Sequence, residues 1–360
     1  MAAAAPPDEL SDIRARVLPA YAGWQDEAAT ALVAPFGNGL INQTYLLSGA
    51  SGRAVLQRVS PIFSPEVHLN ILAVTQRLAE VGMVTPRLVA TRAGAPCLAL
   101  GDSVWRILTH VDGVSFDIVG GAGQARAAGV LIARFHAALD DLPHRFVGMR
   151  LGVHDTAQHL ARLDEAVAAH PAHRLAAQVA PLAVAIRAGA RTLPPLPALP
   201  PRVCHGDLKF NNILFAGAEG AAREQPVCLI DLDVVGPLSL AFELGDAWRS
   251  WCNRAGEDDP EAALDLEIFR ASLDGYCAGR GRGLTADERG GLLLGVEWVS
   301  LGLAARFAAD ALRESYFGWD PRRFPGRGEH NLLRARGQWS LHQLLVASRP
   351  GRAAALASTS

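Results

Sequence analysis

Lysine is almost absent from this 360-residue sequence: Lys209 is the only one, and nearly every other permanent cation is an arginine. The formal net charge of -2 leaves no excess of positive charge, which argues against nucleic acid or an anionic membrane as a partner. Any step that needs a lysine must use Lys209. A small molecule is therefore the expected partner.

Cysteine is also sparse, and its spacing carries no disulfide or zinc pattern. The five cysteines contain no C-x-x-C pair and are Cys97, Cys204, Cys228, Cys252 and Cys277. Residues 1–9 lack the basic start and apolar core of a secretory signal. The apolar stretch 291–307 is interrupted by Glu297 and Arg306, so it predicts a buried helix rather than a membrane span. We therefore expect cytoplasmic residence with reduced thiols.

The most informative stretch is His-Gly-Asp-Leu-Lys-Phe-Asn-Asn at residues 205–212, followed by Ile-Asp-Leu-Asp at residues 230–233. The catalytic loop of protein kinases reads H-R-D-L-K-x-x-N, and Asp207 and Asn212 keep its five-residue step. Strand-like runs flank the motif, as expected for a loop that holds side chains rigidly. The other interpretation is an ordinary Asp/Asn turn beside a hairpin, but it does not explain why Lys209, Asn212 and Asp231 all occur in register with Asp207.

This motif contains the groups that phosphoryl transfer requires. A kinase needs a carboxylate beside the acceptor hydroxyl, oxygen ligands for Mg²⁺, and a cation for the charge on the phosphoryl oxygens. We predict that Asp207 is the general base and that Asn212 and Asp231 hold Mg²⁺. Lys209 is predicted to stabilise the phosphoryl group in the transition state.

Glycine in the second position of the loop resembles the aminoglycoside phosphotransferase and choline kinase superfamily, whose motif is H-G-D-x-x-x-x-N. Further stretches resemble one branch, the N-acetylhexosamine 1-kinases. They are G-N-G-L-I-N-Q-T-Y at 37–45, L-Q-R-V at 56–59, N-I and V-T within 70–75, D-L-D at 231–233, G-D and Arg249 within 245–249, and H-N-L and R-A-R within 330–336. The resemblance covers most of the chain. It implies ATP and Mg²⁺ as cofactors and the anomeric hydroxyl of N-acetylglucosamine or N-acetylgalactosamine as acceptor.

The resemblance also implies an α+β, bilobal, protein-kinase-like fold, and the hydrophobic pattern agrees with it. The first third alternates strand-like runs with one helix, which is expected to have Ser64 as N-cap and Pro65 at its first position. Long helical patterns dominate from about residue 122. We expect a small, mostly antiparallel nucleotide-binding lobe at 1–112 and a larger helical lobe for catalysis and substrate binding at 113–360. Only the alanine-rich first and last few residues look disordered.

Residues expected to bind the nucleotide lie in the first lobe. Gly37 and Gly39 stand between two strand-like runs, where glycine lets backbone amides approach a phosphate, although such a pair also suits an ordinary hairpin. Asn42 and Thr44 are expected to steady that loop or to reach the substrate.

The strand lysine of protein kinases is missing, so an arginine must face the phosphates. Arg58 is the best-placed candidate. Gln57 competes with it because neighbouring strand residues face opposite sides. Backbone groups between Leu108 and Asp112, including His110, are expected to hold the adenine between the lobes.

Candidate substrate residues lie in the helical half and around the motif. They are Asp233, Asp246, Arg249, His330, Asn331 and Arg334. Mixed donors and acceptors suit an amino sugar or N-acetylated sugar, but the same side chains could instead form a polar network that fastens helices together. An aminoglycoside or other aminoalcohol kinase is the alternative enzyme, and a non-catalytic kinase-like module is the alternative from another class.

Overall fold

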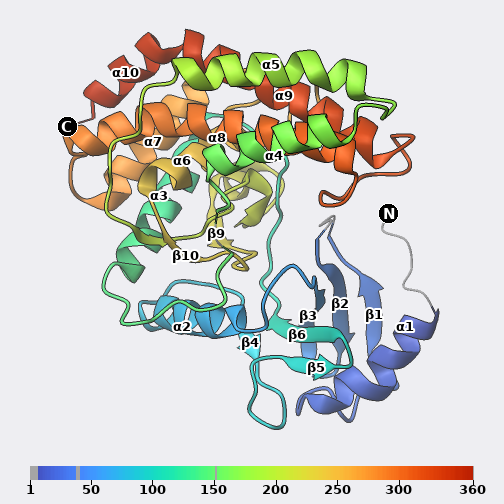
Figure 1. Ribbon diagram of the computed structural model, residues 1–360. Coiled ribbons are helices and arrows are strands. Elements are labelled where there is room, and N and C mark those ends of the chain that lie inside the picture. The colour runs from blue at the N-terminus through green and yellow to red at the C-terminus, as the bar shows by residue number, and fades with distance from the viewer. Residues whose placement is uncertain (1–6, 38–40, 151, 360) are drawn as a thin grey trace. The chain divides into compact units, whose positions relative to one another are not determined.

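The computed structural model describes residues 7–37, 41–150 and 152–359, and it separates into two compact units (Figure 1). The sheet unit is the chain up to Asp112 with Asp141–Arg150 and Asp233–Val235. The helical unit is Gly113–Asp140, Leu151–Leu232 and Gly236–Ser360. The predicted α+β class is confirmed. The two acids of the D-L-D motif belong to different units, because the division falls after Leu232.

A six-stranded antiparallel sheet forms the centre of the sheet unit. Its strands follow the order β1, β2, β3, β6, β4, and β5 also pairs with β6. Their bounds are β1 Leu32–Pro35, β2 Gln43–Gly49, β3 Gly52–Val59, β4 Leu88–Val89, β5 Leu98–Leu100 and β6 Ser103–Thr109. Each of these strands overlaps a strand-like run of the sequence, and β2, β3 and β6 extend a residue or two beyond the predicted runs. β6 pairs with β3 in this sheet. The two strands are distant in sequence, because the helix α2 (Val67–Glu80) and the strands β4 and β5 lie between them.

The N-terminal helical segment packs on one face of this sheet. It begins as α1 (Pro7–Asp12), continues as a π-helical turn (Ile13–Val17) and ends as a 3₁₀ turn (Leu18–Ala20). Ile13 and Val17 are fully buried and share one apolar core with strand residues such as Leu56 and Trp105. Burial of these side chains against the sheet stabilises the helical segment.

Two predictions at helix ends are wrong. Ser64 is not the N-cap of α2, because that helix begins at Val67 and Glu66 stands at its N-cap position. The Ser64 hydroxyl instead accepts the Glu66 backbone N–H at 3.3 Å, within a turn that precedes the helix. At the other end of the chain α10 (Arg349–Ala357) forms where disorder was expected, because the buried Arg352 ties it to Glu297.

Helices build the second unit. They are α3 Ala122–Leu139, α4 Thr156–Ala169, α5 Ala176–Thr192, α6 Leu240–Trp251, α7 Leu266–Arg280, α8 Ala286–Arg313, α9 Arg327–Ala347 and α10. In the middle of the stack α8 packs against α4, α5, α6 and α9 (Figure 1). Among the described helices it alone is long and apolar enough to cross a membrane, but 72% of its most apolar window is buried inside the unit. The prediction of a buried helix at 291–307 is confirmed.

Two short antiparallel pairs carry the motif between the helices. β7 (Arg202–Cys204) pairs with β10 (Gly236–Leu238), and β8 (Ile213–Phe215) pairs with β9 (Pro226–Leu229). The H-G-D-L-K loop connects β7 to β8 and ends in a 3₁₀ turn at Phe210–Asn212. Asp231 follows β9 after one residue, Ile230. This hairpin arrangement brings the end of the loop next to the residues that follow β9.

Candidate active site

The motif loop brings three of the predicted residues together. Lys209 Nζ lies 3.1 Å from Asp207 Oδ2. Asn212 Nδ2 donates to the Asp207 backbone oxygen at 2.8 Å and to its Oδ2 at 3.3 Å. Side-chain donors in the described chain thus use Oδ2 of Asp207, and the Asn212 amide contacts Asp207 through its nitrogen. One carboxylate oxygen and one amide oxygen remain for ligands.

Asp231, the second predicted metal ligand, has an unusual backbone. Its φ is 65°, a left-handed conformation that residues other than glycine seldom adopt and that collects at functional sites. The residue before it is fixed twice: Ile230 N donates to Asn212 O at 2.9 Å, and His205 Nε2 donates to Ile230 O at 2.8 Å. His205 thus braces the loop against the residue before Asp231. Asn212 and Asp231 are held by the same hairpin.

The charges of the loop stabilise one another. Burial by itself would raise the pKa of the Asp207 carboxyl, but Lys209 and His205 outweigh it and lower that pKa. Asp207 in turn raises the pKa of the Lys209 ammonium against the effect of burial, and Glu257 and Asp231 raise it further. Both side chains are about a third exposed, with 34% for Lys209 and 29% for Asp207. A charged acid and a charged lysine are therefore accessible to ligands.

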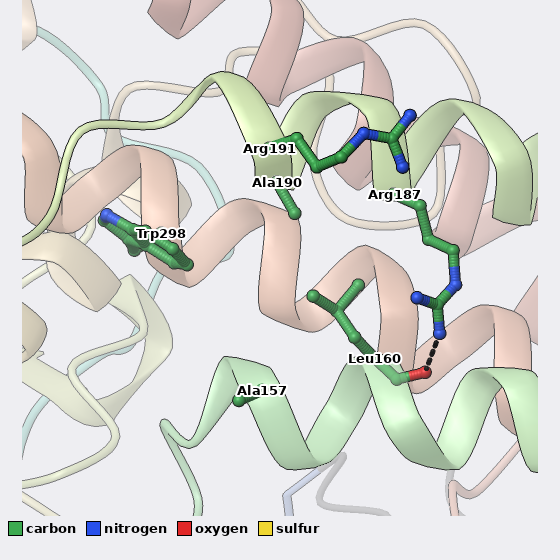
Figure 2. A pocket seen from close by; sticks show the side chains of 6 residues that line it. All are labelled: Ala157, Leu160, Arg187, Ala190, Arg191 and Trp298. Carbon is green, nitrogen blue, oxygen red and sulfur yellow. Dashed lines mark hydrogen bonds between the residues drawn. The ribbon is translucent and has the colours of Figure 1, made fainter.

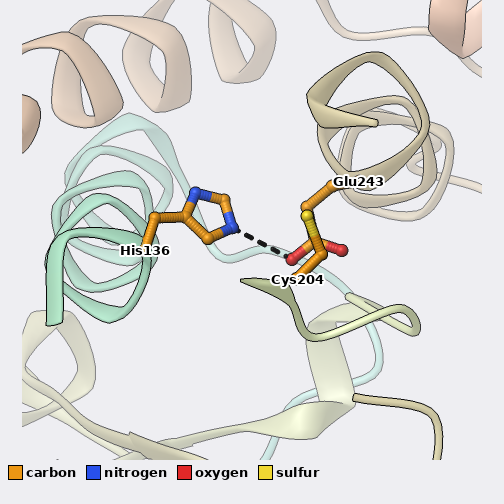
Figure 3. Close-up of side chains that lie close together, drawn as sticks. All are labelled: His136, Cys204 and Glu243. Carbon is orange, nitrogen blue, oxygen red and sulfur yellow. Dashed lines mark hydrogen bonds and ion pairs between the residues drawn. The ribbon is translucent and has the colours of Figure 1, made fainter. Parts of the chain in front are cut away.

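Glu243 of α6 anchors this loop, and the sequence reading missed it. Its carboxylate accepts the backbone N–H of His205 at 2.8 Å and that of Gly206 at 2.9 Å. His136 Nε2 donates to it at 3.2 Å (Figure 3). The other ring nitrogen of His136 lies 3.0 Å from Tyr276 Oη. Gly206 has a φ of 84°, which suits glycine. An acid on an otherwise apolar helix face was the available sequence signal.

His136, Cys204 and Glu243 lie close enough together to raise the question of a metal site (Figure 3). The ring nitrogens of His136 and the carboxylate oxygens of Glu243 already take part in the hydrogen bonds described above. Burial strongly raises the pKa of the Cys204 thiol, and that thiol donates to the Leu238 backbone oxygen at 3.5 Å. A protonated thiol is a poor metal ligand. The cluster therefore serves as a hydrogen-bonded support for the loop.

On the nucleotide side, the register separates Gln57 from Arg58. Arg58 lies on the sheet face that carries the N-terminal helix, with Glu9 at 3.6 Å and Ser103 at 3.0 Å. Gln57 lies on the opposite face and donates to Thr44 Oγ1 at 3.1 Å. Neither side chain has a contact that identifies it as a phosphate ligand. The choice between them therefore remains a prediction.

The remaining nucleotide predictions lie in the loop after β1 and around the end of β6. Gly37 has a φ of 76°, as a tight glycine turn requires, while Gly39 lies outside the described residues. Leu108 pairs with Val55 inside the sheet. His110 follows β6, with its ring 6.0 Å from that of Phe36. Burial and nearby Arg53 lower the pKa of His110.

Asp233 is sealed inside the sheet unit. Its Oδ1 lies 2.5 Å from Arg106 Nη1, and both side chains are 2% exposed. Its Oδ2 accepts Asn42 Nδ2 at 2.7 Å, and Arg106 also donates to Gln57 at 2.8 Å. Arg106 was not among the predicted site residues. The predicted Asn42 and Asp233 thus meet each other, and a contact of Asp233 with substrate stays a prediction.

Asp246 and Arg249 form a buried pair on α6, as their spacing suggested. Arg249 donates to Asp246 Oδ1 at 2.9 Å and to Glu257 Oε1 at 3.0 Å. Glycine allows α6 to approach α8 here: a Cβ on Gly245 would lie 2.8 Å from the backbone of Gly295. Close packing of the two helices thus fixes the face that carries Asp246 and Arg249.

His330 and Arg334 both contact Asp258 from the first turns of α9. His330 Nε2 and Arg334 Nε each lie 2.8 Å from Asp258 Oδ1. Asn331 is separate from them, because its side chain is fully buried and donates to Asp310 Oδ2 at 2.9 Å. The predicted cluster therefore divides: two members join the loop that contains Glu257 and Asp258, and Asn331 fastens α9 to α8.

A hollow of about 280 Å³ lies elsewhere in the helical unit, among α4, α5 and α8 (Figure 2). Its lining residues are Ala157, Leu160, Arg187, Ala190, Arg191 and Trp298. Arg187 donates across it to the Leu160 backbone oxygen at 3.1 Å. None of these six side chains is acidic, and none belongs to the motif. The hollow is therefore not the candidate site.

Comparison with known proteins identifies the fold and the family. A homoserine kinase from Methylobacterium nodulans is 28% identical over 248 residues, covering 67% of this chain and 70% of that protein. An aminoglycoside phosphotransferase structure from Alicyclobacillus acidocaldarius has a TM-score of 0.57 at 16% identity and covers 98% of both chains. An amicoumacin kinase in complex with AMP-PNP, Ca²⁺ and Ami has a TM-score of 0.58 at 13% identity and covers 92% of this chain and 95% of that one. The profile of the phosphotransferase enzyme family matches residues 33–283, well over half of the chain, and the protein therefore belongs to that family.

Proposed function

We propose that this protein is an ATP- and Mg²⁺-dependent kinase that phosphorylates the anomeric hydroxyl of an N-acetylhexosamine. The cluster of Asp207, Lys209 and Asn212 carries the kinase part of this proposal. Asp207 accepts the proton of the acceptor hydroxyl. At the same time the hydroxyl oxygen forms a bond to the γ-phosphorus of ATP, and the bond between that phosphorus and ADP breaks. Lys209 neutralises charge that develops on the phosphoryl oxygens. The products are the sugar 1-phosphate and ADP.

The donor set fits Mg²⁺, which prefers oxygen ligands and retains several waters. Asn212 supplies an amide oxygen and Asp231 a carboxylate, both from the hairpin around the motif loop. When bound there, the ion would neutralise charge on the β- and γ-phosphates. The amicoumacin kinase complex with AMP-PNP and Ca²⁺ supports the use of a nucleotide and a divalent cation in this fold.

The sheet unit would bind ATP. We assign the phosphates to the loop with Gly37 and Gly39, supported by Asn42 and Thr44, and we keep both Gln57 and Arg58 as candidates for the strand side chain that faces the phosphates. The backbone around Leu108 and His110 would hold the adenine. These assignments rest on position in the chain and on the α+β fold that the protein shares with nucleotide-using kinases.

A balance of charge on the acceptor side supports a neutral sugar. Three carboxylates and three guanidinium groups form a charge-balanced set there, made of two ion-paired groups: Arg249 with Asp246 and Glu257, and Asp258 with Arg323 and Arg334. His330 adds no charge at neutral pH, because burial lowers its pKa although Asp258 opposes the effect. A polycationic aminoglycoside would need an acidic surplus, which this set does not offer. Hydroxyl and acetamido groups need mixed donors and acceptors.

A zwitterionic amino alcohol is the second candidate, favoured by the likeness to a homoserine kinase. Homoserine carries one positive and one negative group, which a charge-balanced set can also bind. The presence of both Asp246 and Arg249 on one helix face is compatible with either acceptor. Only the chemistry of turnover separates these candidates.

Coupled ADP release over a panel of acceptors tests the proposal. We expect turnover with N-acetylglucosamine or N-acetylgalactosamine to exceed that with homoserine, ethanolamine and kanamycin. ³¹P NMR of the product should show a phosphate coupled to the anomeric proton. Asp207→Asn serves as the control for contaminating kinases. A phosphate at C6, or faster turnover of homoserine, would contradict the sugar 1-kinase assignment.

A further inference from the structure

One face of α6 carries more than the predicted pair. Phe242, Asp246 and Arg249 are separated by four and three positions, so all three lie on the same face of the helix. His154, in the turn before α4, stacks on Phe242 with ring centroids 5.2 Å apart and planes 7° apart. The stack holds an imidazole over the face that contains Asp246. His154 appeared in no motif of the sequence.

Two buried polar atoms on this face lack a hydrogen-bond partner among the described residues. They are Oδ2 of Asp246 and Nε2 of His154. The other oxygen of Asp246 is fully engaged by Arg249, at 2.9 Å from Nε and 2.8 Å from Nη2. Buried polar atoms nearly always have partners, because leaving them unbonded is costly. Asp246 Oδ2 on this face and His154 Nε2, in the ring stacked on Phe242 of the same face, therefore indicate a place where a polar ligand binds.

The electrostatics connect this face with the catalytic loop. Burial lowers the pKa of the His154 imidazole, and among the charged groups Asp246 has the largest opposing effect. A neutral imidazole offers one N–H donor and one acceptor nitrogen. Burial lowers the pKa of Arg249, whereas Asp246, Glu257 and, with a smaller effect, Asp207 raise it. Arg249 thus lies within electrostatic reach of the proposed base.

We propose that His154 Nε2 and Asp246 Oδ2 together bind the acceptor, and that they select a ligand with a hydroxyl next to a second polar group. This inference rests on the proposed sugar kinase activity and names two atoms that act in it. Asp246 would accept a hydrogen bond from a hydroxyl, and His154 would donate to a neighbouring hydroxyl or acetamido oxygen. A vicinal diol or a hydroxyl beside an acetamido group satisfies both. Ethanolamine has no second acceptor for His154.

Replacing His154 by phenylalanine tests the role of the nitrogen, because the ring can still stack on Phe242. We expect the KM for the N-acetylhexosamine to rise about tenfold to a hundredfold, with the KM for ATP and the melting temperature unchanged. His154→Gln, which keeps a polar terminus, should restore part of the loss. His170→Phe is the matched control, because His170 lies at the far end of α4.

Analogues of the acceptor provide the second arm. A deoxy sugar that lacks the hydroxyl contacted by His154 should lose affinity for the wild type but lose little more in His154→Phe. Turnover by the wild type combined with an unchanged acceptor KM in His154→Phe would overturn this inference alone. Equal rises in the KM values for sugar and ATP, in both His154 variants, would show a structural role and overturn it too. Absence of sugar turnover in the wild type would overturn the proposed function together with this inference.

Discussion

Two cation–carboxylate pairs in this protein differ sharply in exposure. Arg106 and Asp233 of the sheet unit lie 2.5 Å apart with 2% of each side chain exposed. Lys209 and Asp207 of the helical unit lie 3.1 Å apart with 34% and 29% exposed. In the first pair, Arg106 and Asn42 occupy both oxygens of the acid. In the second, side-chain donors of the described chain use only Oδ2.

The buried pair of Arg106 and Asp233, here called the sealed pair, supports the fold. The exposed pair of Lys209 and Asp207, here called the open pair, is suited to catalysis. A sealed pair cannot change its partners without leaving a buried charge behind, so it fixes the end of the D-L-D motif. An open pair can exchange contacts with a bound hydroxyl or phosphate while both charges remain solvated. Substitutions in the first pair should therefore act mainly on folding, and substitutions in the second mainly on turnover.

The largest effect is expected for Asp207→Asn. The amide keeps the shape of the side chain but cannot take a proton, so kcat should fall by about 10²- to 10⁴-fold. Because the open pair is not needed for folding, the melting temperature should change little. Steady-state kinetics and thermal unfolding measure the two effects. A tenfold or smaller loss of kcat would argue against a role as general base.

Arg106→Met should reduce the free energy of unfolding by about 3–5 kcal/mol, because Asp233 would stay buried without its cation. Urea unfolding followed by circular dichroism measures the change. Arg53→Met is the matched control in the same unit: Arg53 lies 2.5 Å from Asp112, but the two side chains are 49% and 78% exposed. That exposed pair should contribute less than about 1 kcal/mol. Similar losses in both variants would show that burial does not distinguish the pairs.

Lys209→Ala should lower kcat by about 10²- to 10³-fold, the range found for donors that stabilise developing negative charge. The KM for ATP should rise much less, because the lysine acts on charge that develops during transfer. Single-turnover kinetics separates the two quantities. An equal loss in kcat and in ATP affinity would assign Lys209 to ground-state binding instead.

Glu243→Gln should weaken the support of the open pair. One carboxylate oxygen becomes an NH₂ group that faces a backbone N–H, so one buried donor loses its acceptor at a cost of about 1–3 kcal/mol. We expect a lower melting temperature together with a reduced kcat and an unchanged KM for ATP. Asp140→Asn, at the exposed partner of Arg202, is the control that should alter neither.

The smallest effect concerns pH. Activity should fall as the pH drops through the pKa of Asp207, which Lys209 and His205 hold below its ordinary value of 3.8 despite burial. Without Lys209 the raising effect of burial remains, so the acid limb of kcat/KM in Lys209→Ala should move to higher pH. A pH profile of wild type and variant measures this shift. An unmoved or downward-shifted limb would exclude Asp207 as the titrating group.

The pair of Asp207 and Lys209 could be predicted from the sequence because its members are close in the chain. Asp207, Lys209 and Asn212 span six residues, and a short loop ending in a 3₁₀ turn brings their side chains together. The strands and most helices could also be predicted, since hydrophobic residues repeat with a fixed period within each element. Helix ends were predicted less well: α2 starts at Val67 rather than at Pro65, and α10 forms at the chain end, where disorder was expected.

The pair of Arg106 and Asp233 and its neighbours could not be predicted from the sequence, because the partners are far apart in the chain. Arg106 and Asp233 are 127 positions apart, and only the sheet register shows that Arg106 shares a face with Gln57. Glu243 was missed because its partners are backbone amides of another segment. His154 was missed because a single histidine in a turn has no pattern until it stacks on Phe242.

The amino-acid sequence alone determined the α+β class, the family resemblance and the groups of the motif loop, because all of these depend on residues a few positions apart. Tertiary structure alone decided which acid is sealed and which is open, which helix anchors the loop, and which imidazole lies over Asp246. Burial and long-range hydrogen bonding are properties of neighbours in space, and the chain does not encode those neighbours at any fixed spacing.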